Sequence, residues 1–456
     1  MKLEISEIIH AVGGRLLGEV DTGKFVTGIS TDTRTIKEGS LFVPIAGDNF
    51  DGHDYIMQAS EKGAICVLTE RQSQPTDMAF PLIYVSSTRR ALMDLADYYR
   101  RKCGVKVVAV TGSAGKTTTK DMMADILSQK FRTKRTIKNF NNDIGMPLSI
   151  FQLEPDDEVL VLEMGMNHAN EIHELSLVGE PDIAVITHIG DAHIENFENR
   201  EGILHAKLEI VDGLRPTGTV VLNGDDPLLT GAIAAEKTAQ FNVLYPSTKN
   251  IVSAEPIGFQ ETRCTFTWHG EEIRLTVPIP GAHMVMNALL ATVVGLEMGV
   301  SPAKITTAFE NFTPPEGRLN IFESNGKTII DDVYNANPSS MFEAIKVLCR
   351  KTPENENRRR VAILGDMNEL GHVAEDRHRE VGEFAARSNL DLLITIGDLS
   401  LHTFNAFSDN EDTTAAIHFV TLPDFLAETN ILQPNDIVLV KASRGMNFEK
   451  IIQAIG

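Results

Sequence analysis

The chain has 456 residues, in which 42 Lys and Arg stand against 63 Asp and Glu, for a formal net charge of −21. So acidic a protein is not expected to bind nucleic acid or anionic membranes in general, and anionic substrates would need local cations or backbone N–H groups. The length predicts roughly two to four domains, and a hydrophobic share of 42% is typical of a globular protein.

The four cysteines, Cys66, Cys103, Cys264 and Cys349, are widely spaced and form no CxxC pair. This spacing predicts neither a disulfide framework nor a zinc site. The N-terminal segment carries acidic residues and lacks the apolar stretch of a signal peptide, and no apolar run reaches the length of a membrane span. We therefore expect a cytoplasmic protein without membrane insertion.

The first block, residues 1–103, mixes short apolar runs with turn-rich segments. Its strand candidates are SLFVPIAG, GAICVLTE and PLIYVSS, and it ends in a helical stretch, RRALMDLADYYRRK. Short strands bounded by turn residues and followed by a helix predict a small α/β domain.

The second block, residues 104–314, begins with a strand, a glycine-rich loop and a helix, in VKVVAV, TGSAGKTTTK and DMMADILSQKF. Three more candidates for buried strands follow, EVLVLEM, DIAVITHIG and TVVLNGDD, separated by helical or loop segments. This alternation predicts a parallel sheet with helical crossovers.

A cluster of structure-breaking residues at Thr313–Gly317 suits a junction between domains. The third block, residues 315–456, has strand candidates in KTIIDDVY, RRVAILGDM, DLLITIGD and DIVLVKAS, which alternate with helical segments. This pattern predicts a doubly wound, Rossmann-like domain. The predicted fold class is therefore α/β in three domains.

The glycine-rich loop is the strongest local signal, and it comprises Thr111, Gly112, Ser113, Ala114, Gly115, Lys116, Thr117 and Thr118. Because it follows a strand and opens a helix, its backbone N–H groups and the positive helix end can hold phosphate oxygens. Lys116 would neutralise the β- and γ-phosphates, and the Thr117 hydroxyl can bind Mg2+. Val110 replaces the first glycine of the strict P-loop pattern, and a merely tight strand–helix turn is the alternative.

Further motifs follow this loop in order: NNDIGMPLSI, LEMGMNHANEIHEL, THIGDAHIENFENREGILHAKLEI, GAHMVMNALLA, PPEGRLN and DDVYNANPSS. Together with the loop, and with matches from STDTR near residue 30 to KASRG near residue 443, they resemble the Mur ligase family over nearly the whole chain. This family contains amide-forming enzymes of peptidoglycan-precursor synthesis. The resemblance implies three domains, ATP as cofactor and two Mg2+ ions.

Three residues beside the loop matter for the metal ions. Glu163 ends an apolar strand, so it lies at the carboxyl edge of the predicted sheet, where ligands of open α/β sheets bind. The resemblance implies that Glu163 and His193 join Thr117 as Mg2+ ligands. Lys207, fourteen residues after His193, matches a lysine that is carbamylated in several family members and would then help to hold the second ion. An ordinary strand-end acid, a structural histidine and a solvated lysine remain the alternatives, and we expect His188 to be structural.

The nucleotide site continues beyond the P-loop. The resemblance implies that Asn287 contacts adenine, Arg318 the phosphates, and Asp332 the nucleotide from the C-terminal domain. For Asn287 a simple hydrogen bond within its helix is the alternative, and Asp331 could be confused with Asp332. The nucleotide would then lie between two domains, so that domain closure assembles the site. Lys116, Lys207, His193 and Arg318 are the expected catalytic residues.

Two sets of polar residues are expected to bind the other substrates. STDTR and GSLFVPIAGDNFDGHDY are similar to the uridine-nucleotide-binding domain of family members, which implies that Ser30, Thr31, Asp32 and Arg34 lie near a UDP-sugar. Asn139 and Asn142 would lie near its muramoyl-peptide. DDVYNANPSS and LGDMNELG look most like the branch of the family that uses D-alanyl-D-alanine, which implicates Asn335 and Asn337, with KASRG as a further candidate. Turn formation and helix capping are the alternatives for these residues.

The expected activity is an ATP-dependent ligase that activates a carboxylate as an acyl-phosphate and joins it to an amine. Its expected partners are the small molecules UDP-N-acetylmuramoyl-tripeptide and D-alanyl-D-alanine, and we expect a monomer that binds no nucleic acid. The alternatives within the family are ligases that add diaminopimelate or Lys, and folylpolyglutamate synthase. A P-loop kinase would release phosphorylated product without an amine, and a non-catalytic binder of a nucleotide-sugar would show no turnover.

Overall fold

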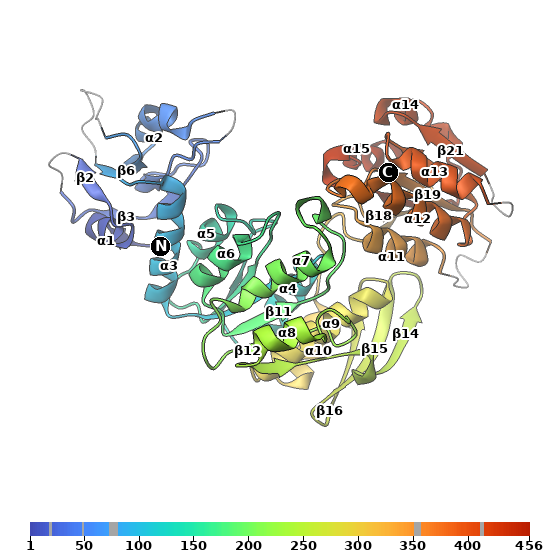
Figure 1. The fold of residues 1–456 in the computed structure, drawn as a ribbon, viewed down its shortest axis with the longest axis horizontal. Helices are drawn as coiled ribbons and strands as arrows, with labels where there is room; N and C mark the ends of the chain where they lie inside the picture. The colour runs from blue at the N-terminus through green and yellow to red at the C-terminus, as the bar shows by residue number, and fades with distance from the viewer. Residues whose placement is uncertain (18–20, 48–49, 73–80, 351–356, 411–414) are drawn as a thin grey trace.

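The computed structural model describes residues 1–17, 21–47, 50–72, 81–350, 357–410 and 415–456. They form three α/β domains in chain order, and Figure 1 shows the middle domain between the other two. Within the described residues, no helix is long and apolar enough to cross a membrane.

The N-terminal domain is built on a five-stranded sheet of order β2-β7-β6-β5-β4, in which only β2 runs antiparallel to its neighbour. A two-stranded sheet, β1 with β3, lies beside it. The strands are β1 Leu3–Glu4, β2 Arg15–Leu17, β3 Phe25–Val26, β4 Gly28–Ser30, β5 Ser40–Phe42, β6 Ala64–Thr69 and β7 Leu82–Tyr84. The helices are α1 Ile5–Ala11, α2 Ile56–Glu61 and α3 Thr88–Cys103.

The middle domain has a six-stranded, fully parallel sheet of order β13-β12-β11-β8-β10-β9. Its strands are β8 Lys106–Thr111, β9 Thr133–Arg135, β10 Val159–Glu163, β11 Ile183–Ile186, β12 Thr219–Leu222 and β13 Asn242–Leu244. The strand β10 is buried at every position, as expected for a strand covered on both faces. The parallel sheet predicted from the sequence is confirmed.

Helices cover the sheet of the middle domain, and a second, smaller sheet extends it. The helices are α4 Lys116–Ser128, α5 Gly145–Ile150, α6 Glu171–Gly179, α7 Arg200–Leu208, α8 Ala232–Thr238, α9 Ala282–Glu297 and α10 Pro302–Glu310. The smaller sheet is antiparallel and consists of β14 Ile251–Ile257, β15 Glu261–Trp268 and β16 Glu271–Val277. This sheet was not predicted from the sequence.

The C-terminal domain has a six-stranded sheet of order β17-β18-β22-β19-β20-β21, parallel except for the edge strand β17. Its strands are β17 Asn320–Ser324, β18 Lys327–Asp331, β19 Arg360–Gly365, β20 Leu392–Ile396, β21 Ala415–Phe419 and β22 Ile437–Lys441. The helices are α11 Pro338–Leu348, α12 Ala374–Ala386, α13 Ser400–Ser408, α14 Leu422–Leu426 and α15 Glu449–Ile455.

Alternate residues of the C-terminal strands belong to two separate cores. Ile330 and Leu439 pack in the large core that includes residues of α11, α12 and α13. Ile329 and Val438, one position earlier, pack in a smaller core with Phe425 of α14 and residues of α15. Because strand side chains alternate between faces, the sheet has helices on both sides, which confirms the doubly wound prediction.

Candidate active site

The P-loop runs from the end of β8 to the start of α4 and turns on two glycines. Gly112 has a φ of +150° and Gly115 a φ of +80°. A Cβ on Gly112 would lie 1.9 Å from Thr187 Oγ1, and a Cβ on Gly115 would lie 2.8 Å from the side-chain amide of Asn287. Only glycine fits at these positions, which lets the loop backbone present its N–H groups closely to a ligand.

Lys116 is the first residue of α4, and its Nζ donates a hydrogen bond to Gly112 O at 2.7 Å. Burial lowers the pKa of the Lys116 ammonium below its usual value; Glu163 and Glu369 oppose this shift, whereas Arg318 adds to it. The ammonium stands at the N-terminus of a 13-residue helix, whose dipole adds positive potential. Such a site attracts a multiply charged anion.

A cavity of about 570 Å³ opens at the P-loop, between the middle and C-terminal domains. The predicted site residues that line it are Ser113, Ala114, Gly115, Lys116, Thr117, Thr118, Asn139, Glu163, His193, Asn287, Arg318, Asp332, Asn335 and Asn337. They come from the carboxyl edge of the middle sheet and from the start of the C-terminal domain. The structure therefore brings together most of the residues that the sequence nominated separately. Of the remaining P-loop residues, Thr111 ends β8 and is fully buried, and Gly112 follows it with a φ of +150°.

Arg318 links the two domains at the P-loop. Its Nη2 donates to Thr117 Oγ1 at 3.0 Å, and its guanidinium carbon lies 4.0 Å from the ring centroid of Tyr334. Stacking on an aromatic face leaves the edge of the guanidinium free to bind oxygen atoms. A phosphate chain on the P-loop would therefore lie within reach of cations from both domains.

Asp332 follows β18 and is engaged by the C-terminal domain itself. Its Oδ2 lies 2.5 Å from Lys441 Nζ, and its Oδ1 accepts a hydrogen bond from Leu319 N at 3.1 Å. Lys441 is 2% exposed and also donates to Asn335 O at 2.9 Å. The carboxylate thus fixes the segment that carries Arg318, in addition to facing the cavity.

Asn335 and Asn337 stand where the chain enters α11. Asn337 Oδ1 accepts from Ser340 N at 2.9 Å, which makes it the N-cap of the helix. Asn335 Oδ1 accepts from Ala336 N at 2.9 Å. Both residues also line the cavity. Capping was the alternative to substrate binding for these residues, and for Asn337 the structure shows the cap at the edge of the cavity.

Glu163 has the features of a cation ligand. It is 2% exposed at the end of β10, and its Oε1 accepts from Asn141 Nδ2 at 2.8 Å. Its Oε2 is buried without a hydrogen-bond partner. A buried carboxylate oxygen without a partner is costly unless a cation or proton satisfies it. Glu163 and the Thr117 hydroxyl supply the hard oxygen ligands that Mg2+ prefers, so these residues fit the ion.

His193 is held by a carboxylate of the other domain. Its Nδ1 lies 2.6 Å from Glu369 Oε2, in the loop after β19. A carboxylate on one ring nitrogen orients the other nitrogen, as in many metal sites. Among the described residues, no three His, Cys, Asp or Glu side chains gather into a metal-binding group.

Lys207 lies on α7 and is 1% exposed, which excludes a solvated surface lysine. It does not line the cavity. Burial, together with the charge of Lys116, lowers the pKa of Lys207 well below its usual range. Both effects disfavour the ammonium form of Lys207 relative to an uncharged or anionic group. The environment of Lys207 therefore suits covalent modification to an anion beside Lys116.

The remaining predicted residues do not line this cavity. Ser30 ends β4, and its Oγ donates to Asp32 O at 2.8 Å. Arg34 Nη2 lies 2.6 Å from Asp32 Oδ2, and its side chain is 85% exposed. Thr31, between these residues, belongs to the same turn of the N-terminal domain. Asn142 Oδ1 accepts from Gly145 N at 2.8 Å, in the turn before α5.

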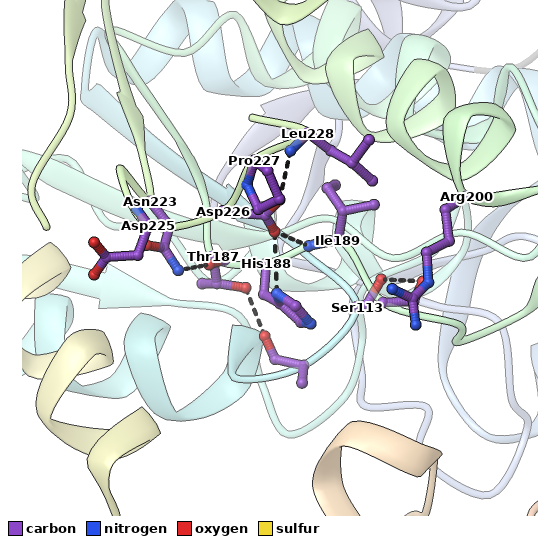
Figure 2. A network of polar contacts seen from close by, with 12 residues as sticks. Ser113, Thr187, His188, Ile189, Arg200, Asn223, Asp225, Asp226, Pro227 and Leu228 are labelled. Carbon is purple, nitrogen blue, oxygen red and sulfur yellow. Dashed lines mark hydrogen bonds and ion pairs between the residues drawn. The ribbon is translucent and has the colours of Figure 1, made fainter. Parts of the chain in front are cut away.

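Two paired histidines in the cavity wall were not predicted as site residues. His188 Nδ1 lies 3.0 Å from Asp226 Oδ2, a buried carboxylate that also accepts from Ile189 N, as Figure 2 shows. His283 Nδ1, on α9, lies 3.1 Å from Glu343 Oε2 on α11 and so links the two domains. Their positions in the sequence could have indicated them, because His188 lies just after the end of the strand β11 and His283 lies at the start of the helix α9.

The fold and this site define a three-domain P-loop protein whose anion site lies between its middle and C-terminal domains. Three domain families match the chain: "Mur ligase family, catalytic domain" over residues 25–108, "Mur ligase middle domain" over 110–295, and "Mur ligase, glutamate ligase domain" over 317–444. The chain belongs to the Mur ligase family.

Its relatives match over their full lengths. The UDP-N-acetylmuramoyl-tripeptide–D-alanyl-D-alanine ligase of Bacillus subtilis is 35% identical, with 99% of this chain and 98% of the relative covered. The enzyme of the same name from Escherichia coli is 33% identical over 100% of this chain and 98% of its own length. The crystal structure of MurF from Acinetobacter baumannii has a TM-score of 0.91 at 30% identity and covers 100% of this chain and 99% of its own. MurF of Thermotoga maritima in complex with ADP has a TM-score of 0.81 at 27% identity, over 94% of this chain and 97% of its own.

Proposed function

We propose that this protein is an ATP-dependent ligase that joins D-alanyl-D-alanine to UDP-N-acetylmuramoyl-tripeptide in the synthesis of peptidoglycan precursors. The observation that carries this proposal is the Arg318–Thr117 contact, which brings a cation of the C-terminal domain onto the P-loop at 3.0 Å. Full-length similarity to ligases of this name supports the choice of substrates.

The reaction begins with an ionised carboxylate, which is a poor acyl donor. One of its oxygens attacks the γ-phosphorus of ATP, the bond to the β-phosphate oxygen breaks, and ADP leaves. The amine of the dipeptide then attacks the acyl carbon of the resulting acyl-phosphate and gives up a proton. Phosphate departs with the former carboxylate oxygen, and an amide remains.

The cations of the site would stabilise the charge that builds up during this transfer. Lys116 and the P-loop N–H groups, which line the cavity, would hold the β- and γ-phosphates, and Arg318, which contacts Thr117, would approach them from the opposite domain. Asn287 lies against Gly115 of the loop and would contact the adenine. Asp332 would contact the nucleotide while it keeps the Arg318 segment in place through Leu319 N. No nucleophilic side chain is needed.

Two Mg2+ ions are part of the proposal. Thr117 and Glu163 would hold the first, and His193 with a carbamylated Lys207 would help to hold the second. Bound there, Mg2+ would shield the phosphate charges from the incoming carboxylate. Two observations support these assignments. Glu163 Oε2 is buried without a hydrogen-bond partner, which a bound ion would provide. Burial disfavours the ammonium form of Lys207, and a carbamate paired with an ion would remove that cost.

The other substrates would contact residues of all three domains. We assign Ser30, Thr31, Asp32 and Arg34 to the UDP moiety, and Asn139 and Asn142 to the muramoyl-peptide. Asn335 and Asn337 would bind the dipeptide. Domain limits at 1–103, 104–314 and 315–456, a monomer and a cytoplasmic location belong to the same proposal.

The test is whether ADP release depends on the dipeptide. The protein is incubated with ATP, Mg2+ and UDP-N-acetylmuramoyl-tripeptide, with and without D-alanyl-D-alanine. A ligase releases ADP steadily only when the dipeptide is present, and the mass of the UDP product rises by one dipeptide less water. Sustained ADP release without an amine, with a phosphorylated product, would instead identify a kinase.

A further inference from the structure

Two loops from different domains meet beside the cavity. The first connects β11 to α7 in the middle domain, and the second connects β19 to α12 in the C-terminal domain. Glu195 N donates to Glu369 O at 3.3 Å, and His193 Nδ1 lies 2.6 Å from the carboxylate of the same Glu369. The loop that carries a predicted metal ligand is thus held by the opposite domain.

Asp191 is the buried ion-pair partner in this contact. Its side chain is 1% exposed, and it receives two guanidinium groups from two domains. Arg200 of the middle domain donates from Nη2 to Oδ2 at 2.9 Å, and Arg377 of α12 places Nε 3.0 Å from the same oxygen, as an ion pair that lacks hydrogen-bond geometry. A buried carboxylate that loses one of two cations becomes much less favourable, so Asp191 ties its loop to the C-terminal domain.

The backbone of both loops is strained at this contact. His193 has a φ of 65° and Glu369 a φ of 64°, which non-glycine residues rarely adopt. Gly371 has a φ of +51°, and a Cβ there would lie 2.8 Å from Glu195 Cβ. Strained conformations of this kind persist only where the surroundings hold them, and here each loop provides part of the other's surroundings.

We propose that Asp191 and Arg377 are positioning residues that form an interdomain clasp, through which docking of the C-terminal domain sets the loop bearing His193. This inference rests on the proposed function for its kinetic consequence, but its structural part does not depend on which amine is used. Both residues of the clasp belong to this chain, so the contact between the domains forms without a ligand.

The test compares Arg377→Gln with Arg379→Gln, a matched variant two residues along the same helix whose side chain lines a separate hollow of the C-terminal domain. Amide hydrogen exchange is measured over residues 190–200 in the presence of ADP. R377Q should speed exchange in this middle-domain loop by about tenfold, while R379Q should leave it unchanged. R377K, which keeps the positive charge that pairs with Asp191 but places it differently, should lie between wild type and R377Q.

Turnover supplies the second measurement. R377Q should lower kcat/KM for ATP by about tenfold, because fewer molecules hold the docked arrangement. Unchanged exchange over residues 190–200 in R377Q and R377K would overturn the clasp, whatever the turnover. Absence of D-alanyl-D-alanine-dependent turnover in the wild type would contradict the proposed function and leave the exchange comparison intact.

Discussion

Lys116 is the residue through which the P-loop most directly meets a phosphate, since its ammonium stands at the start of α4 in the cavity wall. Lys116→Ala should reduce ligation by at least about a hundredfold, because the transferred phosphoryl group loses its neutralising cation. ADP release in saturating substrates measures this. Lys106→Ala, at the exposed opposite end of β8, is the control and should retain normal turnover. Turnover in a folded K116A protein that equals the control would remove the P-loop from the mechanism.

Lys207 is buried, and the charge of Lys116 further disfavours its ammonium form, so carbamylation to an anion would relieve both effects. We predict that Lys207→Ala is nearly inactive and that short carboxylic acids partly restore its activity, since they can replace the carbamate. Rescue is measured as ADP release against acetate or formate concentration. Mass spectrometry of the native protein in bicarbonate buffer is the companion measurement. If acids give no rescue and the carbamate is not detected, Lys207 acts as an ammonium.

Asp331 makes stability depend on pH. Burial raises the pKa of Asp331 to about 6, with Asp332 and Glu449 contributing in the same direction. The folded state therefore binds this proton more tightly than the unfolded state, and stability falls as pH rises from about 4 to about 6. Asp331→Asn should raise the free energy of unfolding by on the order of 1 kcal/mol near pH 7.5 and change it little near pH 4. Thermal unfolding at both pH values measures this. The exposed Asp21→Asn is the control for loss of a charge, and an equal gain there would contradict the assignment.

Site residues that lie within a recognisable motif could be predicted from the sequence, but the residues that contact them in the folded protein could not. Glu163 and His193 were nominated, whereas Asn141 and Glu369, which hold them, were not. Asn142, which was nominated for substrate, forms a turn bond, while its neighbour Asn141 reaches the site. Adjacent asparagines look alike in a sequence, and only the backbone decides which one faces the cavity. Glu369 belongs to another domain, so no local spacing relates it to His193.

At the scale of elements, the strand–loop–helix unit depends on glycines that adopt a positive φ and leave no room for a side chain. Gly115→Ala should weaken ADP binding by at least about tenfold, since a φ of +80° is strained for alanine and its Cβ would meet the Asn287 amide at 2.8 Å. Gly104→Ala is the matched control: its φ is +69°, and nothing lies within 4 Å of the added Cβ. Calorimetric titration with ADP measures both. Equal losses in the two variants would mean that a general effect on the fold, and not the contact with Asn287, weakens ADP binding.

Strands with continuous apolar runs were easier to predict than strands with alternating patterns. The strands β10, β19 and β22 are buried along their whole length and stand out in the sequence. The strands β14 to β16 carry many polar residues, and β14 has no buried position, so their hydrophobic signal is weak. Their pairing comes from turns and from packing on the middle domain, which a single segment does not reveal.

At the scale of the whole molecule, the site exists only where two domains meet. The contacts that cross the junction include Arg318 with Thr117, His283 with Glu343, and Asp191 with Arg377. Each joins the carboxyl edge or a helix of the middle domain to the C-terminal domain. The order of three α/β domains could be predicted from the sequence, but not their relative placement, because residues that lie far apart in the chain form every one of these contacts.

The identity of the amine decides which ligase this protein is, and acceptor selectivity is the most direct test. ADP release is measured with UDP-N-acetylmuramoyl-tripeptide and, in parallel, D-alanyl-D-alanine, D-alanine, L-lysine or L-glutamate. We predict that the dipeptide supports turnover far better than any single amino acid, because a site built to pair the carboxylate of its second residue is left unsatisfied by a shorter amine. Equal rates with free D-alanine, or a preference for L-lysine, would contradict the dipeptide assignment.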